Sequence, residues 1–174
     1  MGQIRKPLPV KLIMSIFTQK DVLFNTAEKT LVKKLGAIDF RSQILDFNQT
    51  QYYKNEFGDN LKREIISFRK LIPPDSLWKI KIITNAIEDK LLKDKKRQIN
   101  IDPGYITQAN LILATTKDYS HRIYARRGIF EEVTLIFKNK TFTALPWTYP
   151  DYQSKELIDI FIQIRNILIL QLKK

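Results

Sequence analysis

The side chains best suited to chemistry in this sequence lie between Asn100 and Tyr152. That stretch holds the only histidine of the chain, one of its two tryptophans and five of its seven tyrosines. Histidine is the side-chain type whose ordinary pKa lies nearest neutrality, so His121 is the natural proton carrier. A lone histidine beside Arg122 is also often a purely structural group. The sequence leaves both interpretations open.

Hydroxyl and ammonium groups come directly before this histidine. Thr115, Thr116 and Lys117 precede His121 within a span of seven residues. Charge-assisted hydrogen bonds from such groups can hold an oxyanion or a phosphate. We therefore predict a phosphate-binding role for these three residues together with Arg122.

Acidic residues flank this segment on both sides. Asp102-Pro103-Gly104-Tyr105 is either a turn, closed by proline and glycine, or one side of a pocket mouth at a strand end. Glu132 interrupts an apolar run, and a buried glutamate needs a partner or a shifted pKa. We predict that Glu132 pairs with Arg122 across a hairpin, and that His121, Glu132 and Asp102 are the candidate catalytic residues.

The segment Leu145–Tyr152 (LPWTYPDY) is an aromatic loop punctuated by proline. It is either a plug that packs the last helix onto the sheet or an aromatic wall for a base or sugar ring. Under the second interpretation it supplies the ligand-binding candidates Trp147, Tyr149 and Asp151. Tyr105 and Tyr124 complete the predicted ligand-binding residues.

Apolar periodicity predicts the elements that must position these side chains. A helix and a strand are both compatible with residues 61–72, and the proline pair that follows favours a strand. A polar connection at 48–60 has room for one helical turn around 52–57. The predicted strands are 10–17, 38–47, 61–72, 98–101, 121–126, 129–137 and 141–144, and the predicted helices are 21–35, 75–93 with Asp75 as N-cap, 107–114, and a last helix capped by Ser154.

The order strand-helix-strand-strand-helix-strand over residues 10–102 is that of a ferredoxin-like α+β unit, an antiparallel sheet with both helices on one face. Residues 103–174 extend it with a β-meander and a long apolar C-terminal helix. At 174 residues the chain has the length of a single domain. The C-terminal helix is apolar on two sides, so it is either sandwiched or forms a homodimer contact.

The composition favours some classes of ligand and excludes some kinds of site. The net charge is +12, which attracts anions such as nucleotides or RNA. With no cysteine and one histidine, thiolate and multi-histidine metal sites are excluded. No apolar run is long enough to span a membrane, and the N-terminal segment does not resemble a signal peptide. We expect a cytoplasmic protein.

Several segments resemble one family of bacterial and archaeal proteins, the domain of unknown function DUF4416. The resemblance covers residues 6–165 and includes NIDPGY at 100–105, ATTKDYSHRIY at 114–124 and LPWTYPDY at 145–152. It implies no established activity and no cofactor. Three uses of the site stay open: binding of an anionic ligand, catalysis on a phosphorylated or nucleotide-like molecule with His121 as acid or base, and assembly through the C-terminal helix.

Overall fold

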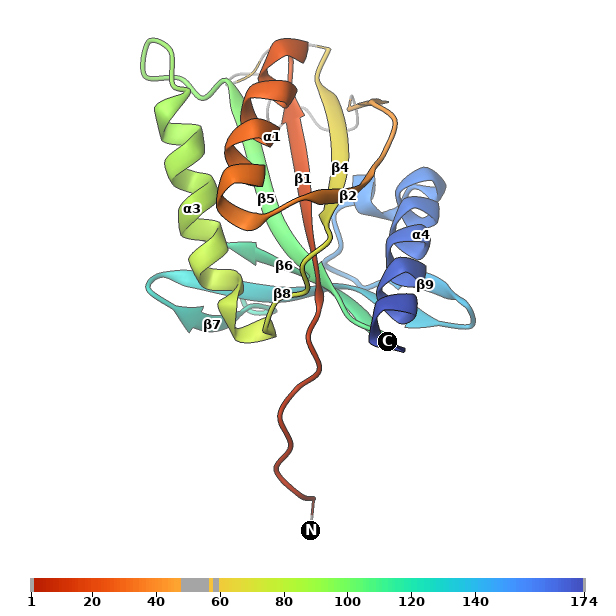
Figure 1. Ribbon diagram of the computed structural model, residues 1–174. Helices are drawn as coiled ribbons and strands as arrows, with labels where there is room; N and C mark the ends of the chain where they lie inside the picture. The colour runs from red at the N-terminus through yellow and green to blue at the C-terminus, as the bar shows by residue number, and fades with distance from the viewer. Residues whose placement is uncertain (1, 48–56, 58–59, 174) are drawn as a thin grey trace.

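The computed structural model describes residues 2–47, 57 and 60–173. Over these residues the fold is a mixed α/β arrangement of one large antiparallel sheet and three α-helices (Figure 1). The strand order is β2-β4-β1-β5-β6-β8-β7, while β3 pairs with β4 and β9 pairs with β8. The strands are β1 (Lys11–Thr18), β2 (Ile38–Arg41), β3 (Leu45–Asp46), β4 (Lys62–Phe68), β5 (Ile99–Ile106), β6 (Asn110–Thr115), β7 (Ile123–Arg126), β8 (Ile129–Lys138) and β9 (Thr141–Ala144).

Strand β1 lies in the middle of the sheet and is buried along its whole length. It pairs with β4 on one side and β5 on the other. Leu12 and Met14 face one apolar cluster, whereas Ile13 faces a second cluster on the opposite side of the sheet. The nearly continuous apolar sequence follows from this double coverage, as predicted.

Helices α1 (Asp21–Leu35) and α3 (Leu77–Lys90) cover the first cluster, on one face of the sheet (Figure 1). The bounds of α1 are those predicted, and Gly36 ends it with a φ of 102°. The prediction of Asp75 as an N-cap is wrong. Pro73 and Pro74 direct the chain into a 3₁₀ turn, η1 (Pro74–Ser76), so α3 begins two residues later.

Helix α4 (Lys155–Leu172) packs against the other face, where it buries Leu157, Phe161, Ile164 and Leu168. A second 3₁₀ turn, η2 (Pro150–Gln153), leads into it, and the predicted cap is present because the Ser154 side chain accepts a hydrogen bond from the Leu157 amide. The chain's own sheet thus covers the predicted apolar stripe. Within the described part of the chain, no helix is long and apolar enough to cross a membrane.

Two predicted elements are wrong. Residues 107–114 are not a helix, because Thr107 Oγ1 accepts hydrogen bonds from the Ala109 and Asn110 amides in a tight turn and the chain continues as β6. The run that follows is apolar on both faces, since Leu111 faces the α4 cluster and Ile112 the α1–α3 cluster. The predicted strand at 38–47 is divided into β2 and β3 around Ser42. The Ser42 hydroxyl accepts a hydrogen bond from the Ile65 amide.

The predicted strand at 61–72 is confirmed as β4. Two-residue turns join the strands of the predicted C-terminal meander. Arg127 and Gly128 join β7 to β8 with φ values of 51° and 75°, and Asn139 and Lys140 join β8 to β9 with values of 52° and 63°. Positive φ at both central residues suits the twist of a two-residue hairpin. Of the polar connection predicted at 48–60, including the helical turn at 52–57, most lies outside the described residues.

Strand β5 corrects a prediction that concerns the site. The Asp102-Pro103-Gly104-Tyr105 segment is not a turn that ends a strand at residue 101, because β5 runs through it to Ile106. At Gly104 the backbone of β6 comes so close that a Cβ atom would lie 2.4 Å from the Ile112 carbonyl oxygen. Glycine is required there for close strand packing and not for a turn.

Candidate functional site: a cleft where two strands part

The sheet is split between β5 and β6. The two strands pair only over Gly104–Ile106, opposite Leu111–Leu113. Beyond that point β6 continues beside β8, so the first half of β5 has no strand partner on that side. The Ile101 amide, which points into the gap, donates instead to Glu88 Oε1 of α3 at 2.7 Å. Because backbone groups alternate along a strand, the Pro103 nitrogen faces the same edge of β5. Proline has no N–H group, and at this unpaired edge no strand needs one.

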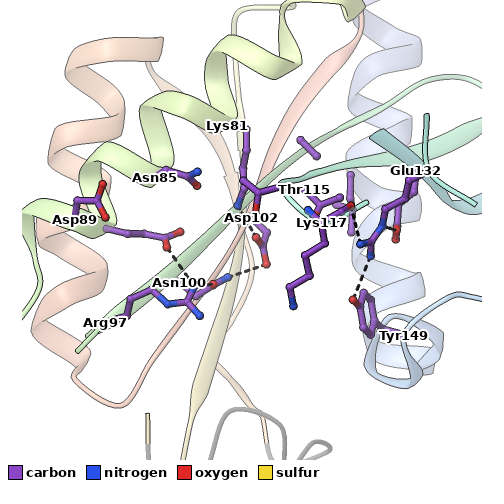
Figure 2. Close-up of a pocket in the computed structure, with 15 residues that line it drawn as sticks. Lys81, Asn85, Asp89, Arg97, Asn100, Asp102, Thr115, Lys117, Glu132 and Tyr149 are labelled. Atoms are coloured by element: carbon purple, nitrogen blue, oxygen red, sulfur yellow. Dashed lines mark hydrogen bonds and ion pairs between the residues drawn. The ribbon is translucent and has the colours of Figure 1, made fainter. Parts of the chain in front are cut away.

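A polar cavity of about 320 Å³ opens at this split (Figure 2). Five charged or amide side chains form a connected network along one wall. Lys81 Nζ donates to Asp102 Oδ1 at 2.9 Å, and Asn100 Nδ2 donates to Asp102 Oδ2 at 2.7 Å. Arg97 Nη1 donates to Asn100 Oδ1 at 2.9 Å and lies 3.5 Å from Glu88 Oε2. Lys81 comes from α3 and reaches past the open edge of β5.

The opposite wall is built on β8 and the segment before β7. Arg122 Nε donates to Glu132 Oε2 at 2.7 Å, and both side chains are almost fully buried. This is the ion pair predicted between Glu132 and Arg122, although the predicted strand at 121–126 begins only at Ile123, so that Arg122 lies before it. His121 Nε2 lies 3.2 Å from the same Glu132 oxygen. Arg122 also donates to the Lys117 carbonyl oxygen and to the Tyr149 hydroxyl, so one guanidinium connects three segments.

A second, aromatic cavity of about 510 Å³ adjoins the first. His121 stacks on Trp147 with ring centroids 5.3 Å apart and an interplanar angle of 12°, and Tyr119 stacks on the other side of His121 at 6.1 Å. Deeper in this cavity, Arg63 forms an ion pair with Asp151. The remaining lining includes the rings of Phe17, Phe47, Tyr149 and Tyr152.

The two cavities form one cleft because five residues line both. They are Asp102, Leu113, Lys117, Arg122 and Tyr149. Figure 2 shows the Lys117 side chain extending between the network around Asp102 and the wall at Tyr149. A ligand that fills both cavities must therefore pass these side chains.

The carboxyl groups of the polar cavity differ in their protonation. Burial raises the pKa of Glu88 to about 7; nearby Lys81 opposes the rise and Asp102 adds to it. Burial alone would also raise the pKa of Asp102, but Lys81 and the Asn100 hydrogen bond hold it below its usual value. One carboxyl can therefore exchange a proton near neutrality, while its neighbour stays ionised.

The cleft brings together most of the residues predicted from sequence. The polar cavity is lined by Asp102, Thr115, Thr116, Lys117, Arg122, Glu132 and Tyr149, and the aromatic cavity adds His121, Trp147 and Asp151. Two tyrosines lie elsewhere. Tyr105 packs against the cluster beneath α1 and α3, where burial and Glu131 raise its pKa to about 12. Tyr124 is 60% exposed on β7, with its ring against Phe130.

Sequence reasoning missed Lys81, Glu88, Arg97 and Asn100 in the polar cavity, and Arg63 in the aromatic one. Three of them carried a usable signal. Lys81 and Glu88 are seven residues apart, so they share one side of α3 next to its apolar face. Arg63 lies on the same face of the buried strand β4 as Ile65, two residues later, and a charged side chain at such a position needs a partner. Among the described residues, no group of three or more His, Asp or Glu side chains could hold a metal ion.

Comparison with known proteins places the chain in a family. The model of the domain of unknown function DUF4416 matches residues 8–168. The chain belongs to the DUF4416 family. No curated protein and no solved structure matches it significantly. For this DUF4416 protein, function must therefore be argued from the cleft itself.

Proposed function

We propose that this protein binds a small nucleotide-like molecule in the cleft between β5 and β6. The main observation behind this proposal is that a charged cavity adjoins an aromatic cavity and shares five lining residues with it. A nucleotide has the matching division into a flat ring and an anionic group. Each cavity has the volume of a small-molecule site.

The aromatic cavity suits the ring. Trp147 and Tyr149 keep 38% and 47% of their surface exposed, so their rings are available to a ligand. Stacking of a base on an aromatic side chain contributes about 1–3 kcal/mol and depends little on the base. The stack of Tyr119, His121 and Trp147 supports the wall-like role proposed for the Trp147–Tyr152 segment.

The polar cavity suits the phosphate. Lys117 and Arg122 stand at the junction, and Thr115 and Thr116 line the same side. Hydroxyl, ammonium and guanidinium donors together satisfy phosphate oxygens well. The net charge of +12 adds a long-range attraction for anions.

A free nucleotide fits this cleft better than RNA does, because the stacking rings and the cations lie inside a cavity of limited volume. Isothermal titration calorimetry with AMP, GMP, CMP and UMP tests the proposal directly. We expect saturable binding of at least one of them, weakened about tenfold or more by Lys117→Met through loss of a charge-assisted hydrogen bond. The exposed Lys29→Met on α1 is the matched control and should leave affinity unchanged.

Two results would overturn the proposal. One is absence of binding by all four nucleotides at millimolar concentration. The other is tight, strongly salt-dependent binding of an RNA oligomer without any mononucleotide binding, which would favour the RNA alternative.

One observation favours enzymatic use of the same cleft as a second candidate. Glu88, with its pKa near 7, faces the polar cavity and can act as a general acid or base at neutral pH. His121, which lies beside Glu132 and lines the aromatic cavity, is the other candidate. Turnover of a bound nucleotide, detected by chromatography of the reaction mixture, and its loss in Glu88→Gln would establish this.

We further infer that residues 10–102 form a ferredoxin-like unit. The order β2-β4-β1-β5, with antiparallel neighbours and with α1 and α3 on one face, supports this inference. A homodimer through α4 would have to use its outward side around Leu170, which is 62% exposed. Sedimentation equilibrium of Leu170→Glu beside the natural protein tests that contact.

A further inference from the structure

The residues at the junction of the two cavities differ in chemistry. Among the five described residues that line both, Lys117 and Arg122 are cations, Leu113 is apolar and Tyr149 carries a hydroxyl. Asp102 is the only carboxylate of the five. In a ligand whose ring occupies one cavity and whose phosphate occupies the other, the atoms between them lie beside this group.

The Asp102 carboxylate is held in a fixed orientation. Lys81 Nζ bonds to one oxygen at 2.9 Å and Asn100 Nδ2 bonds to the other at 2.7 Å. These donors come from α3 and from β5 itself. About a third of the Asp102 side chain remains exposed to the cleft.

The same carboxylate has acceptor capacity to spare. An ionised carboxylate offers about four acceptor positions, and the hydrogen bonds to Lys81 and Asn100 occupy two of them. Lys81 and the Asn100 hydrogen bond also keep it ionised at neutral pH. A rigid, ionised, acceptor-only group at this place fits a ligand that brings hydroxyl donors. In dinucleotide-binding folds a carboxylate recognises ribose hydroxyls in this way.

We propose that Asp102 accepts hydrogen bonds from the ribose hydroxyls of the ligand, so that the cleft selects ribonucleotides over 2′-deoxyribonucleotides. This inference rests on the proposed nucleotide binding and deepens it. The preference arises because a deoxyribose leaves an acceptor of a desolvated carboxylate without a donor, which costs more than the hydrogen bond alone contributes.

The decisive measurement needs no variant. Isothermal titration calorimetry compares AMP, GMP, CMP and UMP with dAMP, dGMP, dCMP and dUMP on the natural protein. We expect the ribose form of the bound nucleotide to bind about tenfold or more tightly, as for a hydrogen bond to a charged group. Equal affinities within each pair would overturn the inference and leave nucleotide binding intact. Absence of binding by all eight would overturn both.

Variants assign the preference to Asp102. Asp102→Asn alone leaves the buried Lys81 ammonium without its partner, so the double variant Lys81→Met with Asp102→Asn keeps the site free of an uncompensated charge. We expect this variant to bind both sugar forms with nearly equal affinity. Lys155→Met with Asp159→Asn, the same pair of changes at an exposed ion pair of α4, should keep the ribose preference. An unchanged ribose preference in the double variant would overturn the assignment to Asp102.

Discussion

The polar and aromatic cavities share one cleft but are held together differently. The polar cavity contains ion pairs between buried or partly buried groups, such as Arg122 with Glu132 and Lys81 with Asp102. The aromatic cavity is edged by stacked rings that stay partly exposed, among them Tyr119 and Trp147. The polar cavity depends mainly on charge balance, whereas the aromatic cavity, apart from the Arg63–Asp151 ion pair, depends on contact area.

This difference separates folding from binding. Removal of one partner from a buried ion pair leaves a charge that water cannot reach, so the fold itself is weakened. Removal of an exposed ring loses one stacking contact and little else. Substitutions in the polar cavity should therefore change stability first, whereas those in the aromatic cavity should change ligand affinity first.

The largest effect should come from Arg122→Met, which leaves the buried Glu132 carboxyl group without its guanidinium partner. Both side chains are at most 3% exposed, and breaking such a pair costs about 3–5 kcal/mol in the free energy of unfolding. Urea denaturation measures this loss. The double variant Arg122→Met with Glu132→Gln should recover most of it, and a double variant as unstable as the single one would contradict the charge-balance argument.

Glu88→Gln tests the polar cavity through the pH dependence of the free energy of unfolding. The native pKa of about 7 lies above the ordinary glutamate value, so the folded state binds a proton that the unfolded state has already lost. Stability should therefore fall as pH rises from about 4.5 to 7, by on the order of 2 kcal/mol. In Glu88→Gln the part of that fall due to Glu88 should be absent, whereas the part due to Glu64, whose pKa burial also raises to about 7, should remain. Denaturation midpoints of both proteins at pH 5 and pH 8 give the comparison, and equal pH slopes would rule out this account of Glu88.

Gly104→Ala tests the point where β5 and β6 meet. The added Cβ would lie 2.4 Å from the Ile112 carbonyl oxygen and 2.7 Å from Leu113 Cδ2. Overpacking of this kind costs about 1–3 kcal/mol. Gly2→Ala, in open space near the N-terminus, is the matched control. Thermal unfolding of both variants shows whether the close approach is real, since equal melting temperatures would exclude it.

Trp147→Phe should have the smallest effect on stability. It keeps a ring against His121 but loses the indole hydrogen bond to the Val133 carbonyl oxygen. We expect a loss of about 1 kcal/mol in the free energy of unfolding. The loss in the free energy of nucleotide binding should be a larger fraction of its total. In a Trp78→Phe background, Trp147 is the sole tryptophan and its fluorescence reports ligand binding. A stability loss as large as that of Arg122→Met would erase the difference between the two cavities.

The sequence predicted much of this architecture where periodicity was strong. Helix α1, strand β1 and the turn at Asn139-Lys140 followed from local pattern. The Arg122–Glu132 pair was also predicted, although Arg122 lies before β7 and not on the strand. Predictions failed where tertiary contacts outweighed local signals. Asp-Pro-Gly suggested a turn, yet β1 pairs with that segment along its whole length. Residues 107–114 were predicted to be a helix, but the Thr107 hydroxyl closes a hairpin turn there instead.

By itself the sequence determined which residue types were available for a site and which neighbours shared a strand face, because alternation and helical periodicity act over a few residues. Only the tertiary structure decided that β5 and β6 part beyond Gly104, and that Lys81, Glu88 and Arg97 enter the gap between them. That outcome depends on contacts between segments far apart in the chain. No local pattern encodes the distance between them.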